Sequence, residues 1–216
     1  MSRSTRATLP FAPPAFRPVE VHAPGLVRTA RMVLRPLRES DRAEYIRILA
    51  LSRQHLCRHS CLHRDGESDG TLFARHLEVC RVGDERGTAW RRVGVLDGGR
   101  IAGCFNLNSI ARGLTFEADA NWWLSADAIG QGLGYEGVAA MLDYALADLP
   151  AGLGLHKVHA AIMPSNTASI RLAERVGLSR QSTGKVSIKI GERWEFHEVY
   201  SRSVLDQPVS LSGIAC

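Results

Sequence analysis

The sequence predicts an α+β fold of three layers, and three observations support this prediction. Two strand-like segments are joined by Asp97-Gly98-Gly99, which favours an antiparallel hairpin. A glycine-rich stretch at residues 129–134 separates another strand-like segment from a strongly periodic helix. A second hairpin turns at Gly191-Glu192, after the last predicted helix. Hairpins that alternate with single helices are typical of a sheet covered by helices.

Periodicity and capping residues define the remaining elements in chain order. Ser40 and Asp41 are N-cap residues for the first helix, which we expect to end near Leu51. Ser165 or Asn166 caps the last helix, and a glycine at position 177 ends it. The expected strands are 32–37, 89–96, 100–108, 115–124, 158–162, 184–190 and 193–200. The expected helices are 41–51, 71–82, one that runs from the glycine stretch to near residue 150, and 166–177.

The length and the proline distribution predict one domain with two tails. The chain has 216 residues, enough for one domain with a proper core. Residues 1–27 are rich in proline and arginine and are expected to be a flexible arm. Residues 28–203 are the predicted domain, and residues 204–216 lack periodicity and are expected to be a tail.

Composition limits the class of protein and its partners. No apolar run approaches the length of a membrane span, and the first residues carry no secretory signal, so we expect no membrane partner. Five scattered cysteines are typical of reduced thiols, which favours the cytoplasm. The net charge of +5 favours anionic ligands, but no Lys/Arg run is dense enough for a dedicated nucleic-acid surface. We expect a monomer or a homodimer.

The stretch Gly130-Gln131-Gly132-Leu133-Gly134 is the strongest local signal for a ligand. Glycines allow backbone N–H groups to approach an anion, and a helix start adds unpaired donors and a positive dipole end. The spacing G-x-G-x-G differs from the dinucleotide fingerprint, and no Lys-Ser or Lys-Thr pair of a triphosphate loop follows. The ligand is therefore predicted to be phosphorylated, and an ordinary strand-to-helix turn is the alternative.

Four further segments, in order and at the right spacing, carry a family resemblance. They are residues 29–37 (TARMVLRPL), 103–113 (GCFNLNSIARG), 155–178 with LHKV, PSNTAS and GL, and 190–197 with IGERW and His197. With the glycine stretch, they resemble the GNAT superfamily of N-acetyltransferases, and more narrowly the RimJ/RimL type. The resemblance covers residues 27–203 and implies a mixed, mostly antiparallel sheet of about six to seven strands flanked by about four helices.

The resemblance implies acetyl-CoA as the co-substrate and gives the glycine stretch a role. In this superfamily the loop amides bind the cofactor pyrophosphate, and the first loop position is cationic or an amide, whereas Ile129 stands there in this chain. The strand before the loop is expected to hydrogen-bond the pantetheine arm through its backbone. The implied cofactor-binding residues are Trp122, Trp123, Leu124, Ile129, Gly130, Gln131, Gly132, Leu133, Gly134 and Asn166.

Acetyl transfer needs a neutral amine, a donor to the oxyanion and a proton for the departing thiolate. The resemblance assigns the last task to Ser169, and a solvent-facing serine is the alternative; Asn166 can likewise be a plain N-cap. Glu117 and Asp119 share one strand face and are candidates for the general base, or are simply solvated carboxylates. His197 matches a family position, but the aspartate expected before it is Phe196.

One cluster lies outside the family pattern. His55, Cys57, His59, Cys61 and His63 alternate after the first helix, and these side-chain types bind zinc. Structural zinc usually takes ligands from two separated pairs, and no second pair is present in the sequence, so no metal is expected. Lining of an acceptor pocket and incidental surface composition are the other interpretations.

Three functional hypotheses remain at this point. The first is acetylation of a protein N-terminal α-amine, and the second is acetylation of a small amine such as an amino acid, a polyamine or an antibiotic. The third is a non-catalytic acyl-CoA-binding protein. The fold does not determine the acceptor, because acceptor specificity lies in variable loops.

Overall fold

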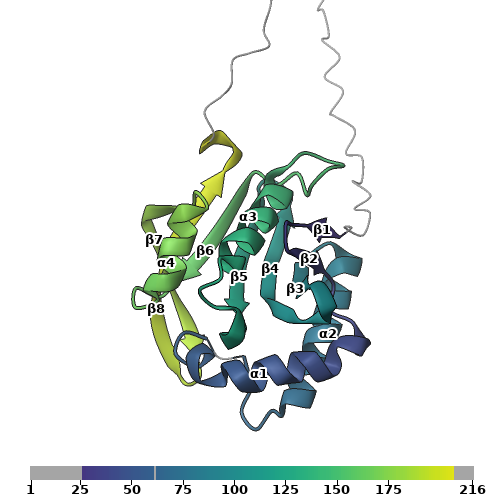
Figure 1. Ribbon diagram of the computed structural model, residues 1–216. Helices are drawn as coiled ribbons and strands as arrows, with labels where there is room; N and C mark the ends of the chain where they lie inside the picture. Colours follow the sequence, from purple (N-terminus) through teal and green to yellow (C-terminus); the bar gives the residue numbers. More distant parts are fainter. Residues whose placement is uncertain (1–25, 61, 207–216) are drawn as a thin grey trace, which may run out of the picture.

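The computed structural model describes residues 26–60 and 62–206, which form one sheet with helices on it (Figure 1). The sheet has eight strands in the order β1-β2-β3-β4-β5-β6-β8-β7. All neighbouring strands are antiparallel except β5 and β6, which are parallel. The strands are β1 Val27–Arg28, β2 Met32–Arg35, β3 Trp90–Leu96, β4 Ile101–Arg112, β5 Phe116–Leu124, β6 Lys157–Ile162, β7 Ser179–Ile190 and β8 Arg193–Ser203. The α-helices of the described residues are α1 Arg42–Leu56, α2 Asp69–Arg86, α3 Leu133–Leu146 and α4 Thr167–Arg175.

The predicted α+β class and the mixed, mostly antiparallel sheet are confirmed, but the sheet has one strand more than the six to seven expected. The additional strand is β1, whose Val27 pairs with Leu34. A strand of two residues has no alternation to detect, so the sequence pattern places its first residue in the flexible arm. Residues 204–206, predicted to belong to the tail, form a short 3-10 helix. Residues 1–25 and 207–216 of the predicted tails, like Cys61, lie outside the described residues.

The helices on one side of the sheet extend beyond their predicted ends. α1 continues to Leu56 because no glycine or proline interrupts it near Leu51. α2 begins after Ser68, whose side chain accepts a hydrogen bond from the Thr71 amide. It ends at Gly87, which has the left-handed conformation with φ 63°. None of the helices in the described ranges is long and apolar enough to cross a membrane.

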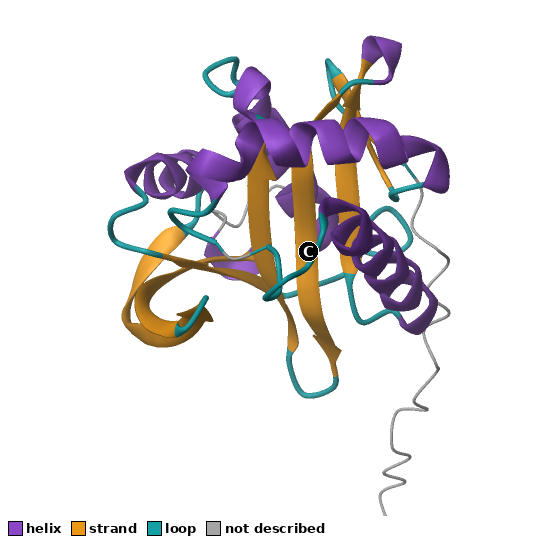
Figure 2. Cartoon of the chain, turned by 90° about the horizontal axis from the view of Figure 1, so that it is seen from below, coloured by secondary structure: helices purple, strands orange, loops and turns teal. Residues whose placement is uncertain are grey.

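Two apolar clusters cover the two faces of the sheet and pack against the helices. Figure 2 shows how the helices lie over the strands. α1 and α2 contribute to the cluster around Val93 and Cys104. α3 and α4 contribute to the larger cluster around Phe105 and Leu107. α3 lies close to β4 because Gly137 faces the Phe105 ring; a Cβ at Gly137 would be 2.2 Å from Phe105 Cζ. This close approach positions the first turn of α3 beside the end of β5.

The sheet opens between its two parallel strands. β5 and β6 pair only where residues 117–119 face residues 157–159, and the last bridged pair is Asp119 with His159. Beyond it β5 continues to Leu124 and β6 to Ile162, with no further bridge between them in the described chain. On this stretch the edge of β5 that faces β6 has backbone groups available to a ligand. After β5 the chain continues into the glycine-rich stretch that leads into α3.

Candidate active site

The glycine loop, residues 129–134, turns the chain from β5 into α3. Gly130 and Gly132 have φ of 76° and 77°, a left-handed conformation that side chains disfavour. Gly132 is the N-cap of α3, so the amides of the first helical turn point out of the helix toward the loop. Ile129 is 53% exposed and supplies no polar group. The loop therefore offers a backbone anion site at a helix N-terminus.

Arg31, just before β2, lies against this loop. Its Nε donates to Glu136 Oε2 over 2.7 Å, its backbone N–H to Glu136 Oε1, and its Nη1 to the Gln131 carbonyl over 2.9 Å. The Thr29 hydroxyl also donates to Glu136. Burial alone would raise the pKa of Glu136, but the hydrogen bonds from Thr29 and Arg31 hold it below its ordinary value. We call Thr29, Arg31, Gln131 and Glu136 the loop clamp.

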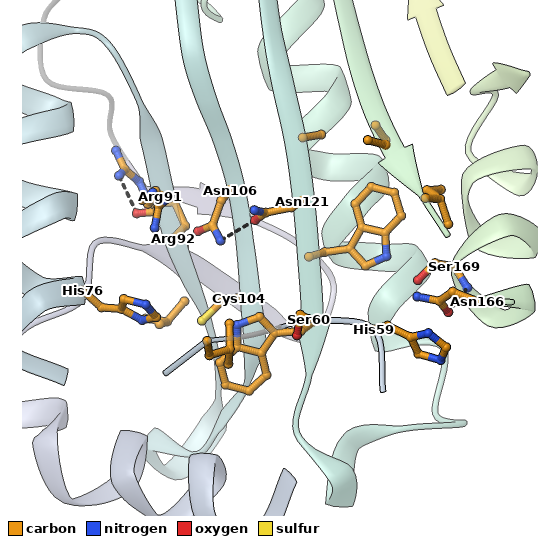
Figure 3. A pocket seen from close by; sticks show the side chains of 18 of the residues that line it. His59, Ser60, His76, Arg91, Arg92, Cys104, Asn106, Asn121, Asn166 and Ser169 are labelled. Carbon is orange, nitrogen blue, oxygen red and sulfur yellow. Dashed lines mark hydrogen bonds between the residues drawn. The ribbon is translucent and has the colours of Figure 1, made fainter. Parts of the chain in front are cut away.

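A cavity of about 290 Å³ lies on the α1/α2 face of the sheet and extends to the opening between β5 and β6. Its floor is a row of polar side chains across three strands, in which Arg91, Asn106 and Asn121 are register partners. Asn106 donates to Asn121 over 2.8 Å. Figure 3 shows Asn166 and Ser169 on one side of these strands and His76 and Arg91 on the other. The cavity thus has two chemically different ends.

The end at the strand opening carries the residues that the sequence assigned to the cofactor and the thiolate. Asn166 caps α4, and its side-chain oxygen accepts from the Ser169 amide over 3.2 Å. Both side chains also line the cavity, so capping does not withdraw them from it. Trp122 and Trp123 line the same cavity. The Leu124 carbonyl lies 3.1 Å from His55 Nε2.

The other end, formed by α2 and β3, contains groups that are neutral or cationic. Burial is the main cause that lowers the pKa of His76 to about 4, followed by the charges of Arg75 and Arg91. His76 is therefore neutral at pH 7, with its Nδ1 2.7 Å from the Tyr45 hydroxyl. Burial raises the pKa of the Cys104 thiol to about 12, so Cys104 remains a protonated thiol and not a nucleophile.

The structure does not bring Glu117 and Asp119 to the cavity wall. Glu117 Oε2 lies 3.0 Å from His159 Nε2 on the neighbouring strand. The Asp119 side chain is exposed, and it lies one alternation along β5 from Asn121, which lines the cavity.

The His/Cys cluster is dispersed in space. His55 approaches the Leu124 carbonyl, His63 lies 2.7 Å from Asp69 Oδ1, and His59 lines the cavity. Cys57 is exposed and borders a second, smaller cavity beside the β7–β8 turn. Within residues 26–60 and 62–206, no three His, Cys, Asp or Glu side chains are placed to share a metal ion.

Sequence reasoning missed three residues at this site: Arg31, His76 and Arg91. Arg31 stands within the motif at residues 29–37, but that motif gives it no role at the loop. No local pattern marks His76 or Arg91, because register and helix packing bring them to the cavity. Only the pairing of β3 with β4 and of β4 with β5, if known in advance, would have shown that Arg91 shares a row with Asn106 and Asn121. His197, which matches a family position, is buried, and its Nδ1 donates to the Glu195 carbonyl over 2.9 Å. It also lines the cavity.

The open parallel pair, the glycine loop and the cavity define an acyltransferase fold, and comparison with protein families agrees. Residues 31–179 match the model of the acetyltransferase (GNAT) domain. The chain therefore belongs to the GNAT family of acetyltransferases.

The individual proteins that the chain resembles share only part of its sequence. The chain is 32% identical over 100 residues, 46% of its length, to the probable N-acetyltransferase YjcK of Bacillus subtilis, and it spans about half (53%) of that curated relative. Its fold is similar to RimJ of Mycobacterium smegmatis in complex with CoA-disulfide, with a TM-score of 0.73, 22% identity, and 85% and 88% of the two chains covered. It is also similar to spermidine N-acetyltransferase of Vibrio cholerae in complex with CoA and spermine, with a TM-score of 0.63, 18% identity, and 80% and 95% covered.

Proposed function

We propose that this chain is an acetyl-CoA-dependent N-acetyltransferase whose acceptor is the α-amine of a protein N-terminus. The observation that carries the proposal is the separation of β5 from β6 immediately before the glycine loop. This geometry provides backbone partners for an extended pantetheine arm and an amide cradle for the pyrophosphate at its end. The resemblance of the sequence motifs to the RimJ/RimL type supports the protein acceptor, and a small amine is the alternative acceptor.

The proposed roles follow the position of each residue. The loop from Ile129 to Gly134 binds the pyrophosphate through its backbone, and residues 122–124 bind the pantetheine arm and the thioester carbonyl. Asn166 contacts the cofactor near its sulfur, and Ser169 gives the departing thiolate its proton, directly or through water. The amine enters from the α1/α2 side and loses its proton through water toward Asp119 and Glu117. Placing amine and thioester side by side supplies much of the acceleration.

An acetyl-transfer screen tests the acceptor. Peptides with free N-termini are compared with amino acids, polyamines and aminoglycosides, and the products are read by mass. Acetylation at the peptide α-amine is expected. Acetylation of small amines alone would show that the acceptor is not a protein N-terminus, while the N-acetyltransferase activity itself would stand.

The loop clamp leads to a prediction about cofactor affinity. Arg31→Ala removes the hydrogen bond to the Gln131 carbonyl and a positive charge beside the proposed pyrophosphate site. Because the Arg31 side chain is half exposed, we expect a loss of about 1 kcal/mol, or a roughly fivefold higher Kd for acetyl-CoA. Titration calorimetry measures the Kd.

Arg81→Ala is the matched control, because Arg81 is also a half-exposed arginine paired with carboxylates, Glu78 and Glu85, but does not line the cavity. It removes the same net charge and should leave the Kd unchanged. Equal Kd values for both variants and the parent protein would show that the clamp does not support cofactor binding.

A further inference from the structure

The α2/β3 end of the cavity has an unusual charge balance. Arg75, Arg91 and Arg92 line it, and none of the described residues that line the cavity is aspartate or glutamate. Arg92 is paired with Asp84, whose carboxylate lies 3.0 Å from its Nη1. Arg75 is neutralised by Glu67, whose carboxylate lies 2.7 Å from its Nη2. Arg91 is different: its Nε is buried and has no hydrogen-bond partner among the described residues. An arginine without a carboxylate at a cavity wall is a ready site for an anion.

The positive charge of Arg91 affects the pKa values of neighbouring groups. Its positive charge contributes to lowering the pKa of His76, after burial and the charge of Arg75. It also acts on Tyr45 and Cys104, which line the same end. A second cation in this space, such as the far amine of a polyamine, would be repelled, whereas an anion would be attracted.

The fold places this charge at a defined distance from the reacting centre. Arg91 is on β3, two strands from β5, whose far edge borders the proposed thioester site. Two strand spacings are about 10 Å, and each residue of an extended peptide spans about 3.5 Å. Arg91 lines the same cavity as its register partner Asn106 and as Asn121, so its side chain is within reach of the second or third residue of an acceptor.

We propose that Arg91 binds a carboxylate of the acceptor, so that the enzyme selects protein N-termini with aspartate or glutamate at the second or third position. Asn106 and Asn121, beside it in the row, complete a polar floor for the acceptor backbone. This selection rests on the proposed N-acetyltransferase function. It adds the chemical class of the acceptor, which neither the fold nor the cofactor site determines.

The test compares acceptors that differ only in charge. Hexapeptides with Asp or Glu at positions two and three are compared with their Asn or Gln counterparts and with Lys counterparts, and kcat/KM is measured from product mass. 4-Aminobutanoate and its amide are included as a small matched pair. A charge-assisted hydrogen bond at this site should give the carboxylate acceptors a kcat/KM about tenfold to a hundredfold higher.

Variants of Arg91 link the preference to this side chain. Arg91→Gln should abolish the preference, Arg91→Lys should retain part of it, and Arg91→Glu should reverse it in favour of the Lys peptides. Because Arg91 Nε has no partner among the described residues, its removal leaves no buried group unpaired, and the variants should fold. Arg81→Gln changes the net charge equally, outside the cavity, and should keep the preference.

The outcomes separate this inference from the proposed function. Equal kcat/KM for acidic and amide peptides, or a preference unchanged in Arg91→Gln, would overturn the role of Arg91 and leave the acetyltransferase intact. If no peptide is acetylated but 4-aminobutanoate is favoured over its amide through Arg91, the protein acceptor is wrong and the carboxylate site stands. If no peptide is acetylated and the amide is acetylated as fast as 4-aminobutanoate, both the protein acceptor and the carboxylate site at Arg91 are wrong.

Discussion

Gly132→Glu should lose acetyl-CoA binding, with the Kd rising about a hundredfold or more. Gly132 has φ 77° at the N-cap of α3, so any side chain strains the loop, and a carboxylate there adds a negative charge beside the proposed pyrophosphate. Like charges placed together at a binding site cost several kcal/mol, and 1.4 kcal/mol is a factor of ten. The measurements are calorimetric titration and the rise in melting temperature at saturating acetyl-CoA.

Gly98→Glu is a closely matched control for this variant. Gly98 has the same φ of 77° and lies in the turn between β3 and β4, where a Cβ would meet no atom within 4 Å. It therefore carries the same backbone strain and the same added charge away from the loop. The control should bind acetyl-CoA as the parent protein does. If Gly132→Glu still shows the full melting-temperature rise, the glycine loop does not bind the cofactor.

Ser169→Ala should lower kcat about a hundredfold, the lower limit of what a positioned proton donor contributes. Ser169 lies in the first turn of α4 and lines the cavity beside Asn166. The Asn166 cap accepts from the Ser169 backbone amide and not from its hydroxyl, so the alanine variant keeps the cap. The Kd for acetyl-CoA should therefore change little. Steady-state rates and titration calorimetry together measure this separation.

Thr167→Ala controls for loss of a hydroxyl in the same helical turn. Thr167 is exposed and does not line the cavity. Its removal should leave kcat unchanged. A Ser169→Ala enzyme with parental kcat would mean that water alone protonates the thiolate, and that the serine has no part in the reaction.

Local patterns in the sequence are sufficient for features that depend on local conformation. The turn at Asp97-Gly98-Gly99 and the glycine loop are predictable because glycine adopts positive φ where other residues do not. The cap of α4 is predictable because an asparagine side chain can accept from an amide of the first helical turn. These features depend on a few neighbouring residues.

Features that depend on pairing between distant segments are not predictable in this way. Strand alternation makes Glu117 a candidate base, but the parallel register places it beside His159, 42 residues later. Arg91 has the pattern of an ordinary strand residue, and only the neighbouring strands and α2 make it part of a cavity wall. The two-residue strand β1 has too few residues for a periodic signal and forms only because β2 offers an edge.

The loop clamp also has a consequence for the order in which the molecule assembles. Arg31 and Glu136 are 105 residues apart in the chain, so their ion pair closes a very long segment. Contacts of such separation form late, because the entropy of closure must be overcome before they stabilise the chain. During synthesis, Arg31 emerges long before its partner. We therefore expect the loop to reach its final shape only in the last stage of folding, after the sheet between the two residues has formed.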